Sequence, residues 1–555
     1  MIRIGNASGF YGDRFSAWHE MLTGGELDVL TGDYLAELTM LILGRDRLRD
    51  PALGYARTFL RQLESCLGLA LDRGVRIVVN AGGLNPAGLA DALAALSAKL
   101  GVAPRIGYVT GDELPGSGAI IARNAYLGAF GIAECLVGGA DIVVTGRVTD
   151  ASLVVGPAIA HFGWGRTDYD ALAGASVAGH ILECGTQATG GNFAFFTELA
   201  DPHHPGFPIA ELAADGSCVI TKHGGTGGAV TIETVTAQLL YEIGAPGYPG
   251  PDVVARFDTI ELSDAGPDRV AVSAVRGDPP PPTLKVGVNT LGGYRNAMTF
   301  VLTGLDIEAK ARLVREQVTA SIGGAGLEFA LARTDHADAD STETASALLH
   351  VHVKDSDPVR AGRAFSQAAV ELALGSYPGC WLTTPPGDAA PFGVFTAEAI
   401  GQDEVAHIAV LPSGERVPIP APERTEVLVP KGIAAPPPEG TAGETLRVPL
   451  GTVVGARSGD KGGDANLGVW ARTSAGYGWL HDYLTVDELR TLLPETAELD
   501  IERHPLPNLR AVNFVIRGLL GAGVAASTRF DPQAKALGEW LRCRLVDVPA
   551  ELGTP

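Results

Sequence analysis

Residues 75–101 read VRIVVNAGGLNPAGLADALAALSAKLG, a pattern typical of a β-strand that leads into an α-helix. A short run rich in Val and Ile comes first, and it ends in small and polar residues from Asn80 onward. Helical periodicity follows at once, with Asn85 as the expected N-cap and Pro86 in the first turn. This stretch therefore predicts one strand–turn–helix unit.

Four other short apolar runs in the first 150 residues resemble this strand. They are IRIGNAS (2–8), LDVLTGD (27–33), RIGYVTGD (105–112) and ADIVVTGR (140–147). A second helical pattern spans residues 51–74. Repeated strand–helix units predict an α/β fold over residues 1–205, with a mostly parallel sheet flanked by helices. In such sheets ligands bind beyond the carboxyl ends of the strands.

Polar and glycine residues follow all five predicted strands. They are Asn6 and Ser8, Thr31 and Asp33, residues 80–85, residues 110–113 and residues 145–150. Strand-to-helix turns need Gly, Asn and Asp for structural reasons as well, so a single turn supports both interpretations. Five such turns at one rim of a sheet favour a binding site.

The pattern changes after residue 205, and residues 206–430 predict an α+β region within the same N-terminal catalytic unit. Hairpins are expected at 206–222, turning at DG, and at 256–277, turning at AGPD. A helix or a strand-to-helix segment is expected at 230–244. Strands are expected at 282–304 and 345–355, and helices at 306–323 and 362–375.

A Pro- and Gly-rich linker is predicted at 429–447, and a third region follows at 446–555. The order of its elements reads β-β-α-β-β-α, which suggests a small α/β sandwich. Its helices are expected at 484–496, where Thr485 and Glu488 can form a capping box, and at 531–546.

Composition limits the class of protein. The chain has 555 residues, of which 46% are hydrophobic, and a net charge of −22, which argues against nucleic acid and anionic membranes as main partners. Its six cysteines are scattered without a CxxC pair, which favours reduced thiols in a cytoplasmic protein. The N-terminus lacks the pattern of a signal peptide, and no apolar run reaches 18 residues, so we expect no membrane span.

The motif RSGDKGGDANLG, residues 457–468, is the strongest local signal for a site. Its glycines suit a loop whose N–H groups bind an anion. Asp460 and Lys461 are catalytic candidates. The residues expected to bind substrate are Arg457, Ser458, Asp464 and Asn466. The alternative is a charged surface turn with internal ion pairs.

A second candidate site is HILECGTQATGGNF, residues 180–193. Glu183 can act as a general base, and Cys184 is a candidate nucleophile near a helix end. Substrate contacts are expected from Gln187, Gly190 and Gly191. A free cysteine is more often a buried apolar residue, and that alternative stays open.

A third candidate is KHGGTGGAV, residues 222–230. His223 suits proton transfer near neutral pH, and Gly225 and Thr226 suit an anion at a helix start. A lone histidine is more often structural.

Two strand ends of the predicted sheet supply further candidates for substrate binding. Arg147 can bind an anion that Asp150 orients, although Asp150 can equally be a helix N-cap. Asn80, Gly82, Gly83 and Asn85 allow close approach of a ligand, or form only a tight turn. The pairs HH at 203–204 and HVH at 350–352 have no third ligand at a characteristic spacing, so we expect no metal.

Several of these motifs together resemble the acyclic terpene utilisation protein A family. They are NASGFYGDR, VVNAGGLNP, ADIVVTGRVTDAS, ECGTQATGGN, TKHGGTGG, LLYEIG and RSGDKGGDANLG, and they run over nearly the whole chain. The resemblance implies a large N-terminal region and a C-terminal ferredoxin-like domain, although β-β-α-β-β-α departs from the strict ferredoxin order by one element. It also implies a pathway of terpene degradation through acyl-CoA thioesters, in which acyl-CoA carboxylases and hydratases take part.

The sequence thus supports an enzyme of branched-chain or terpenoid acyl-CoA or related carboxylate metabolism, of hydratase, lyase or hydrolase type. No GxGxxG follows the first strand, which argues against a dehydrogenase, and no cofactor is expected. The alternatives are a non-catalytic partner subunit of an acyl-CoA carboxylase and a small-anion binding protein. We expect a small anionic substrate such as an acyl-CoA, and a homo-oligomer. We also expect the C-terminal loop to dock against the rim formed by the first 230 residues, in the same chain or across an oligomer.

Overall fold

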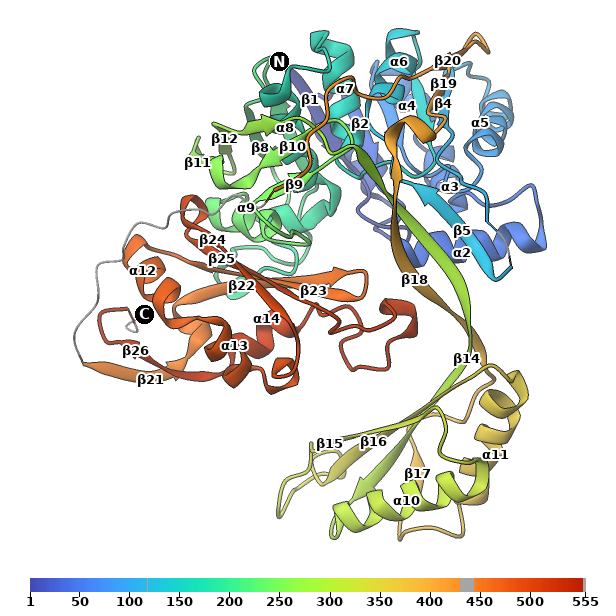
Figure 1. Ribbon diagram of the computed structural model, residues 1–555, viewed down its shortest axis with the longest axis vertical. Helices are drawn as coiled ribbons and strands as arrows, with labels where there is room; N and C mark the ends of the chain where they lie inside the picture. The colour runs from blue at the N-terminus through green and yellow to red at the C-terminus, as the bar shows by residue number, and fades with distance from the viewer. Residues whose placement is uncertain (117, 430–443, 553–555) are drawn as a thin grey trace. The chain divides into compact units, whose positions relative to one another are not determined.

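The computed structural model describes residues 1–116, 118–429 and 444–552 (Figure 1). The chain forms two compact units. The first comprises Met1–Asn289, Phe395–Val524 and Gln533–Pro555, and the second comprises Thr290–Val394 and Ala525–Pro532. The predicted linker at 429–447 lies mostly outside the described residues.

An 11-stranded sheet organises the first unit, in the order β11-β12-β8-β7-β1-β2-β3-β6-β4-β19-β20. Its five central strands are parallel and coincide with the five predicted strands. They are β1 (Ile2–Asn6), β2 (Val29–Gly32), β3 (Arg76–Val79), β4 (Ile106–Thr110) and β6 (Ile142–Thr145). The predicted mixture of α and β structure is confirmed, but the sheet is parallel only in this central part, because the strands added at both edges pair antiparallel.

Helices cover both faces of the parallel strands. One apolar core joins Val78 of β3 to α6 (Phe130–Val137), α7 (Ser152–Phe162) and α8 (Tyr169–Glu183). The opposite core joins Ile77 and Val79 to α1 (Ala17–Gly24), α3 (Arg57–Glu64), α4 (Leu67–Asp72) and α5 (Pro86–Leu100). Alternate residues of β3 thus face opposite helical layers, as the period of a strand requires.

One of these helices begins at its predicted N-cap, and another predicted helix is divided in two. Asn85 is the N-cap of α5, and its side chain accepts a hydrogen bond from Gly88 N at 2.9 Å. The single helix predicted at 51–74 is instead two, α3 and α4, with Ser65 and Cys66 between them.

The hairpins predicted in the second region form, and they extend the same sheet. β7 (Pro208–Leu212) and β8 (Cys218–Lys222) pair around the turn at Gly216, where φ is 85°. β11 (Glu261–Asp264) and β12 (Val270–Ser273) pair next to them. Residues 230–244 form helix α9 (Ile232–Leu239). β19 (Ile408–Val410) and β20 (Arg416–Pro418) complete the other edge, so strands from both predicted regions share one sheet.

Other elements of the first unit flank this sheet. They are α2 (Glu37–Arg49), β5 (Ile120–Ala125), the three-stranded sheet of β9 (Gly247–Pro249), β10 (Val254–Arg256) and β13 (Arg276–Asp278), and the first part of β14 (Thr283–Thr303), which pairs with β5 and β18 (Ala390–Gly401).

In the second unit the strands pair in the order β15-β16-β14-β17. Along the chain its elements are the outer part of β14, α10 (Ile307–Ile322), β15 (Leu327–Ala332), β16 (Ser346–Asp355), α11 (Phe365–Glu371) and β17 (Trp381–Leu382). This β-α-β-β-α-β order is that of a ferredoxin-like fold. The strands and helices were predicted, but their assembly into a separate unit was not.

The C-terminal region of the first unit folds around a separate apolar core. Its sheet has the order β22-β23-β25-β24, formed by β22 (Val454–Lys461), β23 (Asp464–Ala471), β24 (Ile501–Leu506) and β25 (Ala511–Ile516). Helices α12 (Ser474–Tyr483), α13 (Val486–Leu492) and α14 (Leu537–Arg542) pack on this core, and β21 (Thr445–Pro449) pairs with β26 (Leu545–Pro549). Thr485 caps α13 by accepting from Glu488 N, which is one half of the predicted capping box. The Glu488 side chain instead accepts from the Tyr483 hydroxyl group at 2.8 Å.

The motif RSGDKGGDANLG is a β-hairpin, so the prediction of a loop here was wrong. Arg457 to Lys461 lie in β22, residues 464–468 lie in β23, and only Gly462 and Gly463 form the turn. The other glycines permit close packing. A Cβ at Gly459 would lie 2.3 Å from the Tyr241 ring, and one at Gly468 would lie 2.5 Å from the Leu240 side chain. Glycine is therefore needed because the hairpin packs flat against the end of α9.

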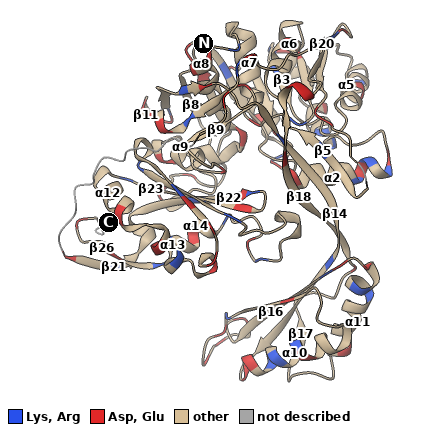
Figure 2. Ribbon diagram, in the orientation of Figure 1, with Lys and Arg blue, Asp and Glu red and all other residues tan. Residues whose placement is uncertain are grey.

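Charged residues of both signs are interspersed along the described elements, including the tip of the β22–β23 hairpin (Figure 2). Among the described helices, none combines the length and the apolar character that crossing a membrane requires.

Candidate active site

The carboxyl ends of β2, β3 and β6 bring together Asp33, Asn80 and Arg147. Asn80 is fully buried; its Nδ2 donates to Asp33 Oδ1 at 2.6 Å and its Oδ1 accepts from Tyr34 N at 2.7 Å. Both ends of this amide are occupied, so Asn80 positions Asp33 and does not face a ligand. Burial raises the pKa of Asp33 well above its ordinary value, and the charge of Asp150 adds to the shift.

Arg147 is the central cation of this cluster, and its side chain is only 4% exposed. Its Nη1 donates to Asp150 Oδ1 at 2.8 Å and to Leu35 O at 3.1 Å. Its guanidinium carbon lies 4.2 Å from the centroid of the Tyr126 ring. Asp150 therefore pairs with Arg147, and the N-cap of α7 is Ala151 instead.

A second cation, Lys285, lies on the same aromatic ring. Its Nζ is 4.7 Å from the Tyr126 centroid, 5.5 Å from the Phe395 centroid and 3.4 Å from Glu37 Oε1. Burial opposes ionisation of Glu37, but Lys285 and Arg147 outweigh it and lower the pKa of this carboxyl group. Glu37 is therefore a carboxylate at neutral pH.

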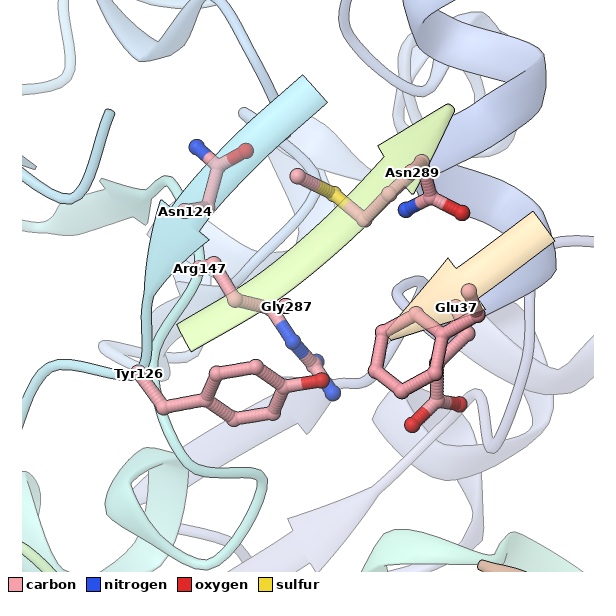
Figure 3. Close-up of a pocket in the computed structure, with 8 residues that line it drawn as sticks. Glu37, Asn124, Tyr126, Arg147, Gly287 and Asn289 are labelled. Atoms are coloured by element: carbon pink, nitrogen blue, oxygen red, sulfur yellow. The ribbon is translucent and has the colours of Figure 1, made fainter. Parts of the chain in front are cut away.

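A small cavity of about 10 Å³, which has room for about one water molecule and is partly open to solvent, lies beside these charges. Figure 3 shows the guanidinium of Arg147 between the ring of Tyr126 and the carboxylate of Glu37. The cavity is lined by Glu37, Met40, Asn124, Tyr126, Arg147, Gly287, Asn289 and Phe395.

The C-terminal end of α8 adds two titratable groups, Glu183 and Cys184. Asn6, at the end of β1, fixes this helix end by donating to Leu182 O at 2.6 Å. Burial raises the pKa of Glu183 well above its ordinary value, and Asp150 and Glu242 add to this effect. Burial and the neighbouring carboxyl groups also raise the pKa of Cys184. A thiol held neutral is a poor nucleophile, so the structure does not support a nucleophilic role for Cys184.

Behind Glu183 lies His180, which is fully buried one turn earlier on α8. Its Nδ1 is 2.9 Å from Glu183 Oε1. Burial lowers the pKa of His180 to about 4, so the contact joins an uncharged imidazole to a carboxyl group that favours its neutral form.

The β22–β23 hairpin places Lys461 at the same cluster in the same chain. Lys461 Nζ donates to Glu242 O at 2.8 Å and lies 5.7 Å from the centroid of the Tyr248 ring. Its side chain remains accessible to solvent, although protein surrounds it closely enough to lower the pKa of the ammonium group, and Lys285 adds repulsion. The charge of Lys461 acts on Glu183 together with that of Arg147.

Asp460 precedes Lys461 on the hairpin and is half-buried. Burial raises the pKa of Asp460 to about 8, and Glu242 and Glu37 contribute to the shift. Asp460 therefore holds a proton at neutral pH, and its interaction with Glu37 connects the hairpin electrostatically to the cavity.

Three predicted residues hold this hairpin in place. Arg457 donates to Gln187 Oε1 and, at 3.2 Å, to Asn192 O, and its guanidinium carbon lies 4.6 Å from the Tyr241 ring centroid. Asn466 Oδ1 accepts from Glu242 N at 2.7 Å. Arg457, Gln187 and Asn466 are therefore scaffolding contacts between the C-terminal region and the rim of the large sheet.

The structure does not bring His223 into the cluster. Its Nε2 lies 3.0 Å from Met21 O, and a Cβ at Gly24 or Gly25 would lie 2.5 or 2.7 Å from its ring. Its partners are thus the end of α1, which supports the structural alternative. Thr226 donates to His223 O, and Gly225 has a φ of 76° in the same turn.

The remaining predicted residues have local structural roles. Ser458 Oγ accepts from Gly538 N in α14, and Asp464 pairs with Arg517 at 2.6 Å. A Cβ at Gly82 would lie 2.5 Å from Thr145 O, and Gly83 needs its φ of 53°. Close packing also explains the glycines at 190 and 191, because a Cβ at Gly190 would contact Leu199 and one at Gly191 would contact Thr186.

The site also contains residues that no sequence motif predicted as site residues: Glu37, Asn124, Tyr126, Lys285, Glu242 and Tyr248. Only Glu242 lies in a motif that drew attention, LLYEIG. Within the described ranges, no group of three or more His, Cys, Asp or Glu side chains is arranged to bind a metal ion.

Comparison with known proteins gives two matches. The profile of the family described as "Acyclic terpene utilisation family protein AtuA" matches residues 2–119 and 116–411. That of the "AtuA ferredoxin-like domain" matches residues 448–547. No curated protein and no solved structure matches the chain.

Proposed function

Because this chain belongs to the acyclic terpene utilisation AtuA family, we propose that it is an enzyme that transfers protons on a branched-chain or terpenoid acyl-CoA, or on a related carboxylate. A hydratase or another lyase is the reaction class that its site supports best. One observation carries the proposal: Glu183 and Asp460, two carboxyl groups with raised pKa, lie in one cluster with Arg147 and Lys461.

Each part of this cluster suits acid–base chemistry next to a carbonyl group. A carboxyl group that keeps its proton at neutral pH can donate it to a leaving hydroxyl group. Lys461, whose pKa is lowered, can remove a proton from the carbon beside the carbonyl. Arg147 and Lys285 can stabilise the negative charge that develops on oxygen.

Hydrolysis by a covalent route receives less support. It requires an activated nucleophile, and the one thiol in the cluster, Cys184, has a raised pKa. A small-anion binding protein without turnover is the second candidate, because Arg147 and Lys285 lie on the same Tyr126 ring and together can bind an anion.

The direct test is proton exchange in D₂O with a panel of branched acyl-CoA thioesters and their free acids. Mass spectrometry detects both deuterium uptake at carbon and gain or loss of water, so an isomerase does not escape detection. We expect Glu183→Gln to lower the exchange rate by about 100-fold or more, the range for loss of a general acid or base.

Glu134→Gln is the matched control, because Glu134 lies in α6 outside the cluster and should keep the wild-type rate. Absence of exchange and of conversion with every compound, by a correctly folded wild-type protein, would contradict the proposed enzyme.

A further inference from the structure

The small cavity beside Arg147 is lined by two residues whose buried polar atoms lack partners. Arg147 Nε and Asn124 Oδ1 have no hydrogen-bond partner among the described residues. Both residues line the cavity, as Figure 3 shows, and their exposed fractions are 4% and 2%. Unpaired buried polar atoms are destabilising, so their presence at a cavity indicates a bound molecule that pairs with them.

The surrounding protein holds both of these atoms in place. Asp112 Oδ2 accepts from Asn124 Nδ2 and from Arg147 N, in both cases at 2.8 Å. Because the Asn124 amino group is bound to Asp112, its carbonyl oxygen is left as an acceptor. Arg147 Nη1 donates to Asp150 Oδ1 at 2.8 Å, and its guanidinium carbon lies 4.2 Å from the Tyr126 ring centroid. The cavity therefore offers one fixed donor, Arg147 Nε, and one fixed acceptor, Asn124 Oδ1.

The size of the cavity and the roles of these two atoms identify what binds there. About 10 Å³ is room for about one water molecule. An anion of that size cannot pair with the carbonyl oxygen of Asn124, and a cation cannot pair with the N–H of Arg147, because each of these groups has a single hydrogen-bonding role. A water molecule both donates and accepts, so it satisfies both atoms.

The walls of the cavity leave such a water within reach of a substrate. Met40, Tyr126 and Phe395 supply apolar surface, and Glu37 and Asn289 are the other polar residues that line the cavity. The cavity is partly open to solvent. The water can therefore be replaced after each turnover, and a substrate carbon can approach it from the open side.

A water bound in this way keeps the two positions that a hydration reaction uses. Water has two lone pairs and two O–H groups; Arg147 Nε occupies one lone pair, and Asn124 Oδ1 occupies one O–H group. The second lone pair can attack a carbon, and the second O–H group can give its proton to a base. The charge of Arg147 acts on Glu183, so the water lies in the same cluster as the proposed acid–base group.

We propose that this cavity holds the water molecule that the enzyme adds to its substrate, or receives from it in the reverse direction. The inference rests on the proposed function and identifies where its second substrate, water, is bound. In hydration the water oxygen bonds to the β-carbon, the water proton passes to the Glu183 carboxylate, and the α-carbon takes a proton from Lys461 as the double bond is lost. In dehydration the C–O bond breaks, Glu183 returns its proton to the departing hydroxyl group, and Lys461 removes the α-proton.

A crystal structure of the full chain tests the binding of the water. We expect one ordered water that lies about 2.7–3.2 Å from both Arg147 Nε and Asn124 Oδ1, the range of an ordinary hydrogen bond. Clear density for both side chains around an empty cavity would overturn the inference, and so would an ion at that position.

Isotope exchange tests whether this water reacts. The probes are branched 3-hydroxyacyl-CoA thioesters, from 3-hydroxy-3-methylbutyryl-CoA upward in chain length, in D₂O enriched in ¹⁸O. High-resolution mass spectrometry separates deuterium at carbon from ¹⁸O in the hydroxyl group, and we expect the wild-type protein to introduce both labels. Asn124→Leu removes the acceptor at similar volume, so the ratio of ¹⁸O uptake to deuterium uptake should fall at least about tenfold, the effect of one lost hydrogen bond.

A second variant, Gly287→Ala, narrows the cavity and keeps every polar group. Its Cβ would lie 3.1 Å from the Phe395 ring and 3.3 Å from the Tyr126 ring, and all three residues line the cavity. The ratio of ¹⁸O uptake to deuterium uptake should therefore fall in this variant too. It keeps the test decisive if Asn124→Leu does not fold.

Arg123→Met is the matched control and should keep the wild-type ratio, because Arg123 lies on the same strand as Asn124 but pairs with Glu398 at 2.9 Å. Wild-type ratios in both Asn124→Leu and Gly287→Ala would overturn the inference. Deuterium uptake without ¹⁸O uptake by the wild-type protein would refute the inference alone, because proton transfer would then occur without water. Neither label with any probe, by a folded wild-type protein, would refute the proposed function, and the inference would fall with it.

Discussion

At the residue scale, the environment of Asp460 changes the protonation state of its carboxyl group at neutral pH. Burial, together with Glu242 and Glu37, raises its pKa to about 8 from an ordinary value of 3.8. The folded protein thus keeps a proton that the unfolded chain loses above about pH 4. The same side chain can serve as an acid at neutral pH only because it is held in this cluster.

The pH dependence of Asp460→Asn follows from this shift. If protonated Asp460 assists turnover, the wild-type rate should fall as pH rises through about 8, and the variant should lack that decline. Rate–pH profiles between pH 5 and 10 measure it. Identical profiles for the two proteins would show that Asp460 does not titrate in turnover.

Stability gives an independent measure of the same proton. A raised pKa in the folded state contributes stability that is fully present below about pH 4 and is lost as pH rises through about 8. Asp460→Asn cannot ionise, so its stability relative to the wild type should increase from pH 4 to pH 8. Urea unfolding at both values checks this, and a constant difference would contradict the buried, protonated state.

At the element scale, the β22–β23 hairpin connects the C-terminal sheet to the rim of the large sheet. Its position depends on Gly459 packing on Tyr241, on Arg457 reaching Gln187, and on Asn466 binding Glu242 N. The glycines that suggested an anion-binding loop allow this flat contact instead. Local sequence could not distinguish an anion-binding loop from a closely packed hairpin, because both require glycine.

Gly459→Ala tests the hairpin's docking. The added Cβ would lie 2.3 Å from the Tyr241 ring, so we expect destabilisation of about 1–3 kcal/mol, the range for overpacking. Chemical denaturation measures it, and exchange activity should fall because Lys461 moves with the hairpin.

The control for this variant is Gly68→Ala, where nothing lies within 4 Å of the new Cβ. Wild-type stability and activity in Gly459→Ala would show that the close contact does not determine where the hairpin sits.

At the scale of the whole molecule, local patterns predicted the large sheet because its strands are short, apolar and followed by helices. They also predicted that the ends of these strands carry Arg147 and Asp150. The second unit was missed because its ferredoxin-like order arises from strands that are distant in sequence, and pairing between them leaves no local pattern.

The same lack of a local pattern explains why the sequence predicted only part of the site. Lys285 reaches Tyr126 only because β14 pairs with β5, and Glu242 reaches Lys461 only because the hairpin docks on residues that follow α9. Motifs identified Glu183, Asp460 and Lys461, whose neighbours in sequence are distinctive. They also suggested His223, which the tertiary structure packs against α1 instead.

The central claim is that the C-terminal hairpin supplies Lys461 to a proton-transferring site at the rim of the large sheet. The most direct measurement is the rate of deuterium exchange at substrate carbon for Lys461→Met, with Lys99→Met on the exposed face of α5 as the control. The account predicts a loss of at least about 100-fold for Lys461→Met with unchanged circular dichroism, and a wild-type rate for the control. A wild-type exchange rate in folded Lys461→Met would contradict it.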